Sequence, residues 1–191
     1  MSRLWGLLTA AMIAMSASIV HATPAKATLL AGDVEVARCI RLASNGRGWL
    51  EKTLWGLRDQ EAGWVGAKIR NADGSYDLGP LQINSWWVPR ISVLVHRSES
   101  DVWTWLQHDA CFNVYATRWI FLTELKSVQD YWKAIGHYHS RVRWRNTRYI
   151  QNVGRRLVAR FGPAAFEKYG RTPSCRLGLS SMSLSIMEYY R

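Results

Sequence analysis

The chain has few acidic residues, few cysteines and no long apolar run after its N-terminus. Its 191 residues include 14 Asp and Glu against 25 Lys and Arg, a formal net charge of +11. Because a membrane helix needs about 20 consecutive apolar residues, no span is expected beyond the N-terminus. The sequence has no internal repeat or low-complexity tract, which excludes a repeat array. The length suits one domain with a substantial core.

The N-terminus has the features of a secretory signal peptide. Arg3 supplies a positive charge, Leu4–Val20 is apolar with many small residues, and Val20-His21-Ala22 fits a small-residue cleavage site. We expect residues 1–22 to be removed on export to the periplasm; Ala25-Lys26-Ala27 is an alternative site, with cleavage after residue 27. An uncleaved membrane anchor is the other interpretation, which the shortness of the run disfavours.

The excess of basic residues limits the class of partner. Removing residues 1–22 would take away one charged side chain, Arg3, and leave a formal net charge of +10. A protein this basic accumulates on polyanions, which include nucleic acid, anionic lipid and carboxylate-bearing peptidoglycan. Because an exported protein is separated from the cytoplasm, we expect no nucleic-acid partner.

Only three cysteines are present, Cys39, Cys111 and Cys175. An exported chain meets an oxidising compartment, so a disulfide is expected. We predict the pair Cys39–Cys111, because both residues fall in segments with a helical pattern. Cys175 belongs to a Pro/Ser/Gly-rich tail and is left over, and the cysteine spacings do not match a zinc site.

The spacing of apolar residues predicts a mainly helical single domain with one irregular insertion at residues 63–80. The turn cluster Asn71–Ser75 lies in that insertion and indicates a small hairpin or an ordered loop. Pro89 is expected to interrupt a helix. The predicted helices run from Asp33 to about Ala43, from about Trp49 to Ala62, from Leu81 to about Trp87, from Ser98 or Asp101, from Asp109 to about Lys126, from Gln129 to Tyr138, and from an Asn146 cap to the Gly162 stop.

Glu61 is a carboxylate at a position where the helical pattern calls for an apolar residue. The three apolar residues that precede it on the same helical face are Leu50, Leu54 and Leu57. Loss of solvent raises the pKa of a carboxyl group, which keeps part of it protonated near neutral pH. Such a group can protonate a glycosidic oxygen as a general acid. The other interpretation is a solvated Glu at a helix end, which is what we expect of Glu51 and Glu124.

Neutral amide side chains follow Glu61 at a Gly-Pro turn. Gln82 and Asn84 each carry two N–H donors and one acceptor oxygen, a set that suits sugar hydroxyls and N-acetyl groups. Gly79 allows the backbone to approach a partner closely. The amides could instead satisfy loop backbone groups, which is common.

Several motifs together resemble the soluble lytic transglycosylases, and in particular their branch associated with conjugation, type IV pilus and specialised secretion systems. The resemblance extends from about Ala37 to Phe161 and includes the positions of Cys39 and Asp109-Ala110-Cys111. The motifs are Gln60-Glu61-Ala62-Gly63, Arg70-Asn71, Gly74-Ser75-Tyr76-Asp77-Leu78-Gly79-Pro80-Leu81-Gln82-Ile83-Asn84-Ser85-Trp86-Trp87, and Ala134-Ile135-Gly136-His137-Tyr138-His139-Ser140.

The resemblance implies a lysozyme-like, mainly α catalytic domain over residues 29–170, with a tail of unassigned role at residues 171–191. It implies that Glu61 cleaves peptidoglycan glycan strands, acting first as acid and then as base, to leave 1,6-anhydro ends. The expected partners are glycan strands and components of a secretion, pilus or conjugation apparatus, and the expected state is a monomer. The substrate-binding residues that follow from the motifs are Gly79, Gln82, Asn84, Tyr138, Asp77 and Trp86.

Two alternatives to this function remain open. If the carboxylate of Asp77 faced the cleft, it could stabilise an oxocarbenium ion or activate water, and the protein would be a muramidase. We expect instead that Asp77 accepts backbone N–H bonds in its turn, because Asp is common in turns. The second alternative is a non-catalytic protein that binds wall glycan and assists assembly.

The remaining polar and aromatic residues near these motifs have weaker signals. Tyr138 could contact a sugar or simply belong to the core. His137 and His139 face apart on a helix and no Cys or carboxylate cluster joins them, so we expect no metal and no cofactor. Tryptophans flank the proposed cleft as candidates for sugar stacking, and a basic run after Tyr138 is expected to be a solvated edge facing anionic stem peptides. These residues are Trp64, Trp86 and Trp87, and Arg141, Arg143, Arg145 and Arg148.

Overall fold

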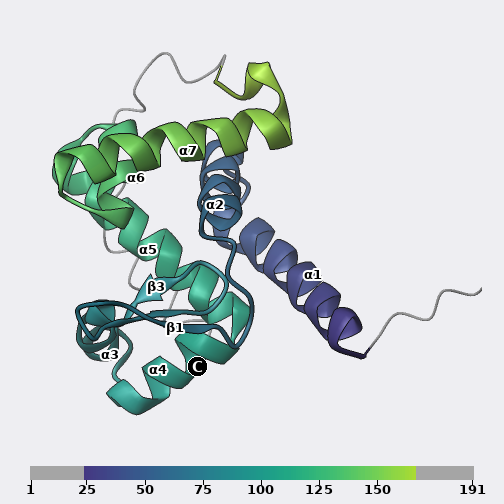
Figure 1. Cartoon of the computed structure of the whole chain (residues 1–191), viewed down its shortest axis with the longest axis vertical. Coiled ribbons are helices and arrows are strands. Elements are labelled where there is room, and N and C mark those ends of the chain that lie inside the picture. Colours follow the sequence, from purple (N-terminus) through teal and green to yellow (C-terminus); the bar gives the residue numbers. More distant parts are fainter. Residues whose placement is uncertain (1–23, 167–191) are drawn as a thin grey trace, which may run out of the picture.

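Helices dominate the computed structural model, which describes residues 24–166 (Figure 1). The mainly α, single-domain fold class predicted from the sequence is confirmed. The proposed signal peptide, residues 171–191 and Cys175 lie outside the described residues. Between residues 24 and 166, no helix is both long and apolar enough to cross a membrane. The α-helices are α1 (Pro24–Ser44), α2 (Gly48–Glu61), α3 (Val88–Val95), α4 (Glu99–His108), α5 (Ala110–Val128), α6 (Tyr131–His139) and α7 (Arg143–Phe161).

A small antiparallel sheet of order β1-β2-β3 occupies the segment after α2. Residues Asn71–Ser75 connect the first two strands, and the turn is closed by the N–H of Ser75, which donates to Asp73 Oδ1 at 3.0 Å. The hairpin expected from this turn cluster is confirmed. The strands are β1 (Lys68–Arg70), β2 (Tyr76–Leu78) and β3 (Ile83–Asn84), followed by the 3-10 helix η1 (Ser85–Trp87); a second 3-10 helix, η2 (Pro163–Phe166), ends the described chain.

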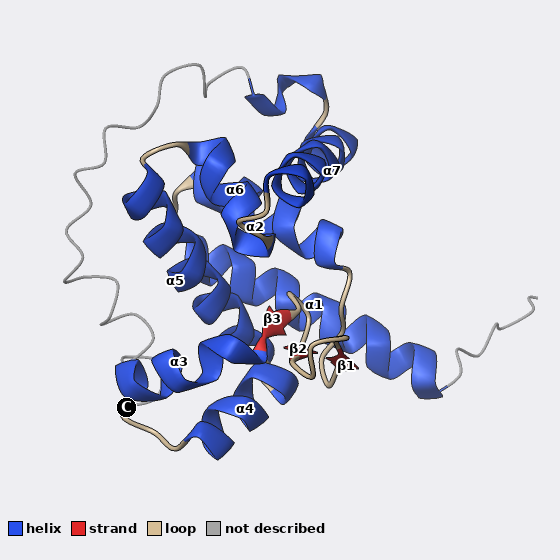
Figure 2. Ribbon diagram, turned by 60° about the vertical axis from the view of Figure 1, so that its left-hand side comes forward, coloured by secondary structure: helices blue, strands red, loops and turns tan. Residues whose placement is uncertain are grey.

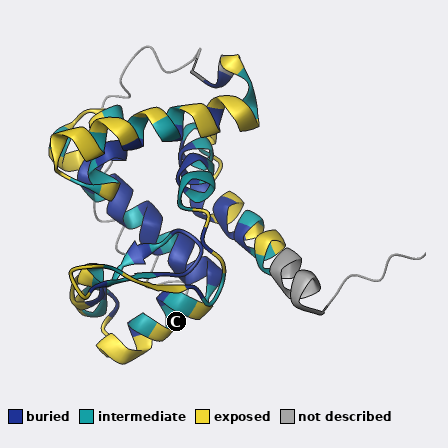
Figure 3. Cartoon of the chain, in the orientation of Figure 1, coloured by how far each residue is buried: buried dark blue, intermediate teal, exposed yellow. Residues whose placement is uncertain are grey.

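Helix α5 is the centre of the molecule. Both views show it running between one group of helices, α2, α6 and α7, and a second group made of the strands with α3 and α4 (Figures 1 and 2). Its side chains are buried around most of its circumference, whereas the outer face of α7 is exposed (Figure 3). Two apolar clusters therefore pack on different sides of α5, one containing Leu54 and Phe121 and the other Leu106 and Phe112. Tyr115 and Tyr138 each pack against both clusters, so the two halves meet at these side chains.

Helix α1 begins at Pro24, nine residues before the predicted Asp33 cap, so this predicted boundary is wrong. The residues between them include several good helix formers, and the Gly preceding Asp33 is tolerated inside the helix. Asp33 has a different partner: its Oδ1 accepts a hydrogen bond from Arg58 Nη2 at 2.7 Å. The bond ties α1 to α2.

The helix predicted from Leu81 to about Trp87 is also wrong. The segment forms β3 and then η1, in which Asn84 Oδ1 accepts from the N–H of Trp86 at 3.0 Å. Pro89 does not interrupt a helix but lies in the first turn of α3. A proline lacks the N–H that the first turn cannot use, and its fixed φ suits that position, so it starts a helix more easily than it continues one.

The predicted N-caps divide into correct and incorrect ones. Ser98 caps α4 and Asp109 caps α5, each by accepting a backbone N–H, at 3.1 Å and 2.8 Å. Gly162 ends α7 as predicted. The Asn146 cap is wrong, because α7 already begins at Arg143; Asn146 instead donates to the carbonyl of Ser140 at 3.3 Å. Its side chain fills the space where Gly136 lacks a Cβ, which locks α6 onto α7.

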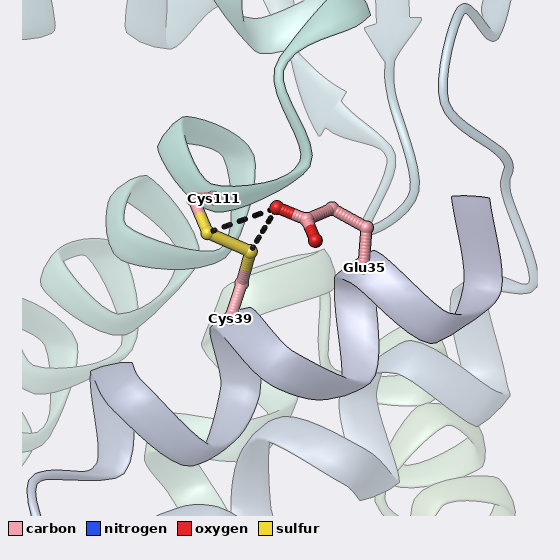
Figure 4. Close-up of side chains that lie close together, drawn as sticks. All are labelled: Glu35, Cys39 and Cys111. Carbon is pink, nitrogen blue, oxygen red and sulfur yellow. Dashed lines mark hydrogen bonds between the residues drawn. A yellow bond between two sulfur atoms is a disulfide. The ribbon is translucent and has the colours of Figure 1, made fainter. Parts of the chain in front are cut away.

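The predicted disulfide is present and joins α1 to the start of α5. Cys39 and Cys111 are bonded, with their Cα atoms 4.9 Å apart. Figure 4 shows the carboxylate of Glu35 beside both sulfurs, with Oε1 at 3.8 Å and 4.0 Å. Since disulfide sulfurs carry no proton and are not thiolates, these are carboxylate–sulfur contacts and the cluster is no metal site. Glu35 is paired with Arg38.

Candidate active site

A polar cavity of about 490 Å³ lies where α2, the small sheet, α6 and α7 meet. It brings together residues that are far apart in the sequence, including most of those singled out above. The predicted site residues that line it are Glu61, Asp77, Gln82, Asn84 and Tyr138; the other lining residues are Asn71, Ala72, Asp73, Ile83, Trp87, Ile120, His139 and Arg145.

Glu61 reaches this cavity because it is the last residue of α2. Leu50, Leu54 and Leu57 are fully buried on the same helical face, as the spacing predicts. At Ala62 the chain turns into a left-handed conformation with φ +50°, and its N–H donates to the carbonyl of Arg58 at 2.9 Å. The helix thus stops where its buried face runs out, and the carboxylate of Glu61 is left between the core and the cavity.

The surroundings of Glu61 raise its pKa to about 7. Loss of solvent is the main cause, a hydrogen bond from Tyr149 opposes it, and the negative charge of Asp77 adds to the rise. Near neutral pH the residue is therefore divided between carboxylic acid and carboxylate. A group in this state can donate a proton and take one back.

The hydroxyl of Tyr149 in α7 donates a hydrogen bond to Glu61 Oε1. Burial raises the pKa of Tyr149 well above its usual value, so the phenol stays protonated and remains a donor. The sequence analysis missed this residue. The helical spacing could have indicated that Tyr149 is buried, because it lies four residues before the buried Val153 on the same face. The local sequence gives no indication that its hydroxyl contacts Glu61.

Asp77 and Asn84 are paired across neighbouring strands. The amide Nδ2 of Asn84 donates to Asp77 Oδ1 at 3.0 Å and to Ser75 Oγ at 2.9 Å. Asp77 was expected to accept turn backbone N–H groups, whereas in the structure its carboxylate accepts from the side-chain amide of Asn84. Since the carboxylate of Asp77 also lines the cavity and acts on the pKa of Glu61, the two acids belong to one site.

Gly79 does not line the cavity but supports the turn that carries Gln82. Its φ is +69°, and a Cβ there would collide with the carbonyl of Leu106 and the side chain of Asn113. Gln82 also adopts a positive φ, +49°, and its Nε2 donates to the carbonyl of Gly79 at 2.7 Å. This bond fixes the Gln82 side chain on the cavity wall.

The buried Asn113 of α5 holds the same turn in place. Its Oδ1 accepts the N–H of Leu81 at 3.1 Å, and its Nδ2 donates to the carbonyls of Leu78 and Leu106 at 2.9 Å and 2.8 Å. A fully buried amide with three backbone partners positions a loop more firmly than an exposed one. The sequence analysis missed it, because an Asn inside a long helix carries no local signal of this role.

Tyr138 both lines the cavity and supports its floor. Its hydroxyl donates to the carbonyl of Leu81 at 2.9 Å and lies 3.3 Å from Thr117 Oγ1. Burial raises the pKa of Tyr138, so it too stays a neutral phenol. Tyr138 therefore belongs to the core and also lines the cavity; its contact with a sugar stays a prediction.

Of the three tryptophans expected to flank the cleft, Trp87 lines the cavity and the other two do not. Trp86 is 71% exposed and is not among the residues that line the cavity. Trp64 is also exposed. The neighbouring Trp87 is the indole on the cavity wall, with its ring 5.7 Å from that of Trp119 in an edge contact.

His139 and Arg145, which were not among the predicted substrate-binding residues, also line the cavity. His139 stacks flat on Tyr149, with ring centroids 4.7 Å apart and an angle of 4°. Burial lowers the pKa of His139, the charge of Arg145 lowers it too, and Asp77 raises it. Arg145 itself lines the cavity. The wall formed by α6 and α7 therefore carries a guanidinium beside an imidazole that favours its neutral form.

Glu124 is not the solvated helix-end residue that the sequence suggested. It is 5% exposed and accepts a hydrogen bond from Arg141 Nη2 at 2.9 Å. His137 Nδ1 lies 3.1 Å from its other oxygen. This trio ties α5 to α6 on a side of the molecule that does not line the cavity.

The assembled groups can transfer a proton to a ligand and bind neutral polar groups beside it. Glu61 can act as acid or base and Tyr149 orients its carboxyl group, while Gln82 and Asn84 line the cavity with amides that already bond to Gly79, Ser75 and Asp77. No family model, curated protein or solved structure that was compared with the chain matches it. Any assignment of function therefore depends on the residues and geometry of this site.

Proposed function

We propose that the protein is a peptidoglycan lytic transglycosylase with a lysozyme-like fold, and that Glu61 is its catalytic residue. The observation that carries the proposal is Glu61, a carboxylic acid on the cavity wall whose pKa is raised to about 7. The motif resemblance of residues 60–87 and 134–140 supports the same class. The substrate is the β-1,4 bond between N-acetylmuramic acid and N-acetylglucosamine.

In the first step Glu61 donates its proton to the glycosidic oxygen. The bond from that oxygen to C1 of the muramoyl sugar breaks, its electron pair stays on the departing oxygen, and C1 acquires oxocarbenium character. A pKa near 7 supports this step, because an appreciable share of Glu61 is still protonated at neutral pH. The hydrogen bond from Tyr149 fixes which oxygen of the carboxyl group is free to face the substrate.

In the second step the carboxylate of Glu61 takes the proton from the muramoyl 6-hydroxyl. The oxygen of that hydroxyl bonds to C1, which closes a 1,6-anhydro ring and returns Glu61 to its acid form. No water is consumed, so one carboxylate suffices where most glycosidases use two. Both N–H groups of Asn84 are already donated to Ser75 and Asp77, and one N–H of Gln82 is donated to Gly79. The remaining N–H of Gln82 suits a hydroxyl or N-acetyl oxygen next to this bond.

A muramidase is the second candidate, and one observation favours it. Asp77 lines the same cavity as Glu61, so a second carboxylate is available to stabilise positive charge at C1 or to activate a water molecule. Two features favour the first candidate. The carboxylate of Asp77 already accepts a hydrogen bond from Asn84. Its negative charge raises the pKa of Glu61, so Asp77 has a role in tuning the acid that does not require it to contact C1 or water.

We infer further that the protein works in the periplasm after export and opens the wall locally for a secretion, pilus or conjugation machine. The disulfide Cys39–Cys111 supports an oxidising compartment. The alternative without catalysis is a glycan-binding assembly factor. It predicts binding to the wall with no cleavage, whatever residue stands at position 61.

Clearance of purified sacculi by the wild-type protein and by Glu61→Gln separates an enzyme from a binder. Gln keeps the shape of Glu61 and can still accept the bond from Tyr149, but it has no proton to give. We expect the variant to retain binding to sacculi and to lose about a thousandfold in clearance rate. Equal clearance by the two proteins would refute the catalytic assignment, and sedimentation with sacculi serves as the control for binding.

A further inference from the structure

The basic run that follows Tyr138 divides into residues with different surroundings. Arg141 is neutralised by the buried Glu124, with its Nη2 2.9 Å from the carboxylate. Arg143 and Arg148 are exposed and do not line the cavity. Arg145 alone of the four is part of the cavity wall. The four arginines that the sequence suggested as one solvated edge therefore differ: Arg145 lines the cavity, and the other three lie outside it.

The charge of Arg145 is available to a ligand. Among residues 24–166, no salt bridge joins its guanidinium to a carboxylate. Its guanidinium carbon lies 5.3 Å from the ring centre of Trp144, a neighbour that is 62% exposed. Stacking on an indole restrains the side chain without neutralising it, so the cation keeps its full attraction for an anion.

His139 lies close enough to Arg145 for that charge to lower its pKa. The ring is held flat against Tyr149. The other charged groups that face the cavity are Glu61 from α2, Asp77 from β2 and Asp73 from the turn before it. The acidic groups thus come from α2 and the hairpin, while the α6–α7 side offers one free guanidinium with a neutral imidazole beside it.

We propose that Arg145, with His139 beside it, forms a subsite for a carboxylate carried by the muramic acid unit of the strand. This carboxylate belongs to the stem peptide or, in a strand without peptide, to the lactyl group. The inference depends on the proposed function, since it names the substrate feature that the same cavity selects. A guanidinium binds a carboxylate through charge-assisted, often paired hydrogen bonds. Glycan whose carboxylates are blocked is then a poorer ligand.

The test measures binding in the Glu61→Gln background, so that turnover does not enter. Three soluble ligands are compared: peptide-bearing strands, the same strands with their carboxylates converted to amides, and amidase-treated strands that expose only lactyl carboxylates. We expect Arg145→Gln to weaken binding of peptide-bearing strands about tenfold. The amidated strands should bind equally weakly to the Glu61→Gln protein and to the Glu61→Gln protein that also carries Arg145→Gln. The matched control is Arg148→Gln, which removes the same charge from the same helix outside the cavity.

Each result is decisive. A loss with Arg145→Gln that exceeds the loss with Arg148→Gln, and that disappears on amidated strands, supports the subsite. If the loss persists on amidase-treated strands, the subsite also binds a lactyl carboxylate; if it does not, the subsite requires a peptide carboxylate. Equal losses in the two variants, or no loss in either, overturn it. Failure of the wild-type protein to cleave any strand would refute the proposed function, while the binding comparison would still decide whether Arg145 binds a carboxylate.

Discussion

The hydroxyl of Tyr149 donates a hydrogen bond to Glu61 Oε1, and this contact joins the last residue of α2 to the buried face of α7. It has two effects on the acid. It orients the carboxyl group, and it favours the charged form, so that the pKa of Glu61 is lower than burial alone would make it. The charge of Asp77 acts in the opposite direction.

Replacing these two neighbours should move the activity profile in opposite directions. The acid must be protonated, so activity falls as pH rises through the pKa of Glu61, about 7. Tyr149→Phe removes the group that lowers this pKa, and the alkaline limb should shift to higher pH. Asp77→Asn removes the charge that raises it, and the limb should shift to lower pH. The measurement is the clearance rate of sacculi from pH 5 to 9.

The same pair of variants has an internal control. Tyr149→Phe should also lose about tenfold in maximal rate, because the acid is no longer oriented. Thr147→Ala, an exposed change in the same helix outside the cavity, should leave the profile where it is. Shifts of the same sign in both site variants would contradict the assignment of these roles.

Stability should respond to pH through Glu61. Its pKa rises from 4.5 in the unfolded chain to about 7 in the fold. The contribution of its protonated form is therefore fully present below pH 4.5 and is lost as pH rises through 7. Glu61→Gln has no such dependence, so its stability relative to wild type should increase over that range, by at most about 3 kcal/mol. Urea unfolding of both proteins at pH 4.5, 6, 7 and 8 measures the difference, and parallel curves would contradict it.

Asn113 should be among the most sensitive positions in the core. Asn113→Ala leaves the N–H of Leu81 and the carbonyls of Leu78 and Leu106 without their partner. Because each buried unpaired group costs about 1–3 kcal/mol, we expect a loss of at least about 3 kcal/mol in the free energy of unfolding. Thermal unfolding measures it, with the exposed Thr104→Ala as the control. A loss below about 1 kcal/mol would show that the turn does not depend on this side chain.

The disulfide should contribute to stability because it closes a long loop. Cys39 and Cys111 are separated by 72 residues. A double Cys→Ser variant should lose about 2–4 kcal/mol, mainly because its unfolded chain is less constrained. Urea unfolding with and without a reducing agent measures the loss. If the agent lowered the stability of the double variant as much as that of the wild type, the effect would not come from this bond.

The sequence was sufficient for features that depend on local pattern. The Leu50–Leu54–Leu57 face predicts both α2 and the position of Glu61, because helical periodicity alone decides which residues share a face. Asp109 was predicted as a cap, and Ser98 as one of two candidates with Asp101, because short polar side chains at a helix start accept backbone N–H groups. The disulfide prediction needed only the compartment and the helical context of two cysteines.

Features that depend on tertiary contacts could not be predicted. Tyr149 is separated from Glu61 by 88 residues, and only the packing of α7 on α2 brings its hydroxyl to the acid. Asn113 likewise acts on a turn more than 30 residues away. The predictions for Pro89 and Asn146 were wrong because the sequence allows two placements of each. A proline can end a helix or lie in its first turn, and an asparagine can cap a helix or lie inside it; tertiary packing decides between them.

The central claim is that Glu61 drives cleavage without consuming water. Digesting sacculi in water labelled with oxygen-18 and weighing the muropeptides by mass spectrometry distinguishes the two acceptors, with Glu61→Gln as the matched inactive control. We expect 1,6-anhydro products that carry no label from the wild-type protein, and none above background from the variant. Reducing-end products that carry the label would show that water is the acceptor, and would contradict it.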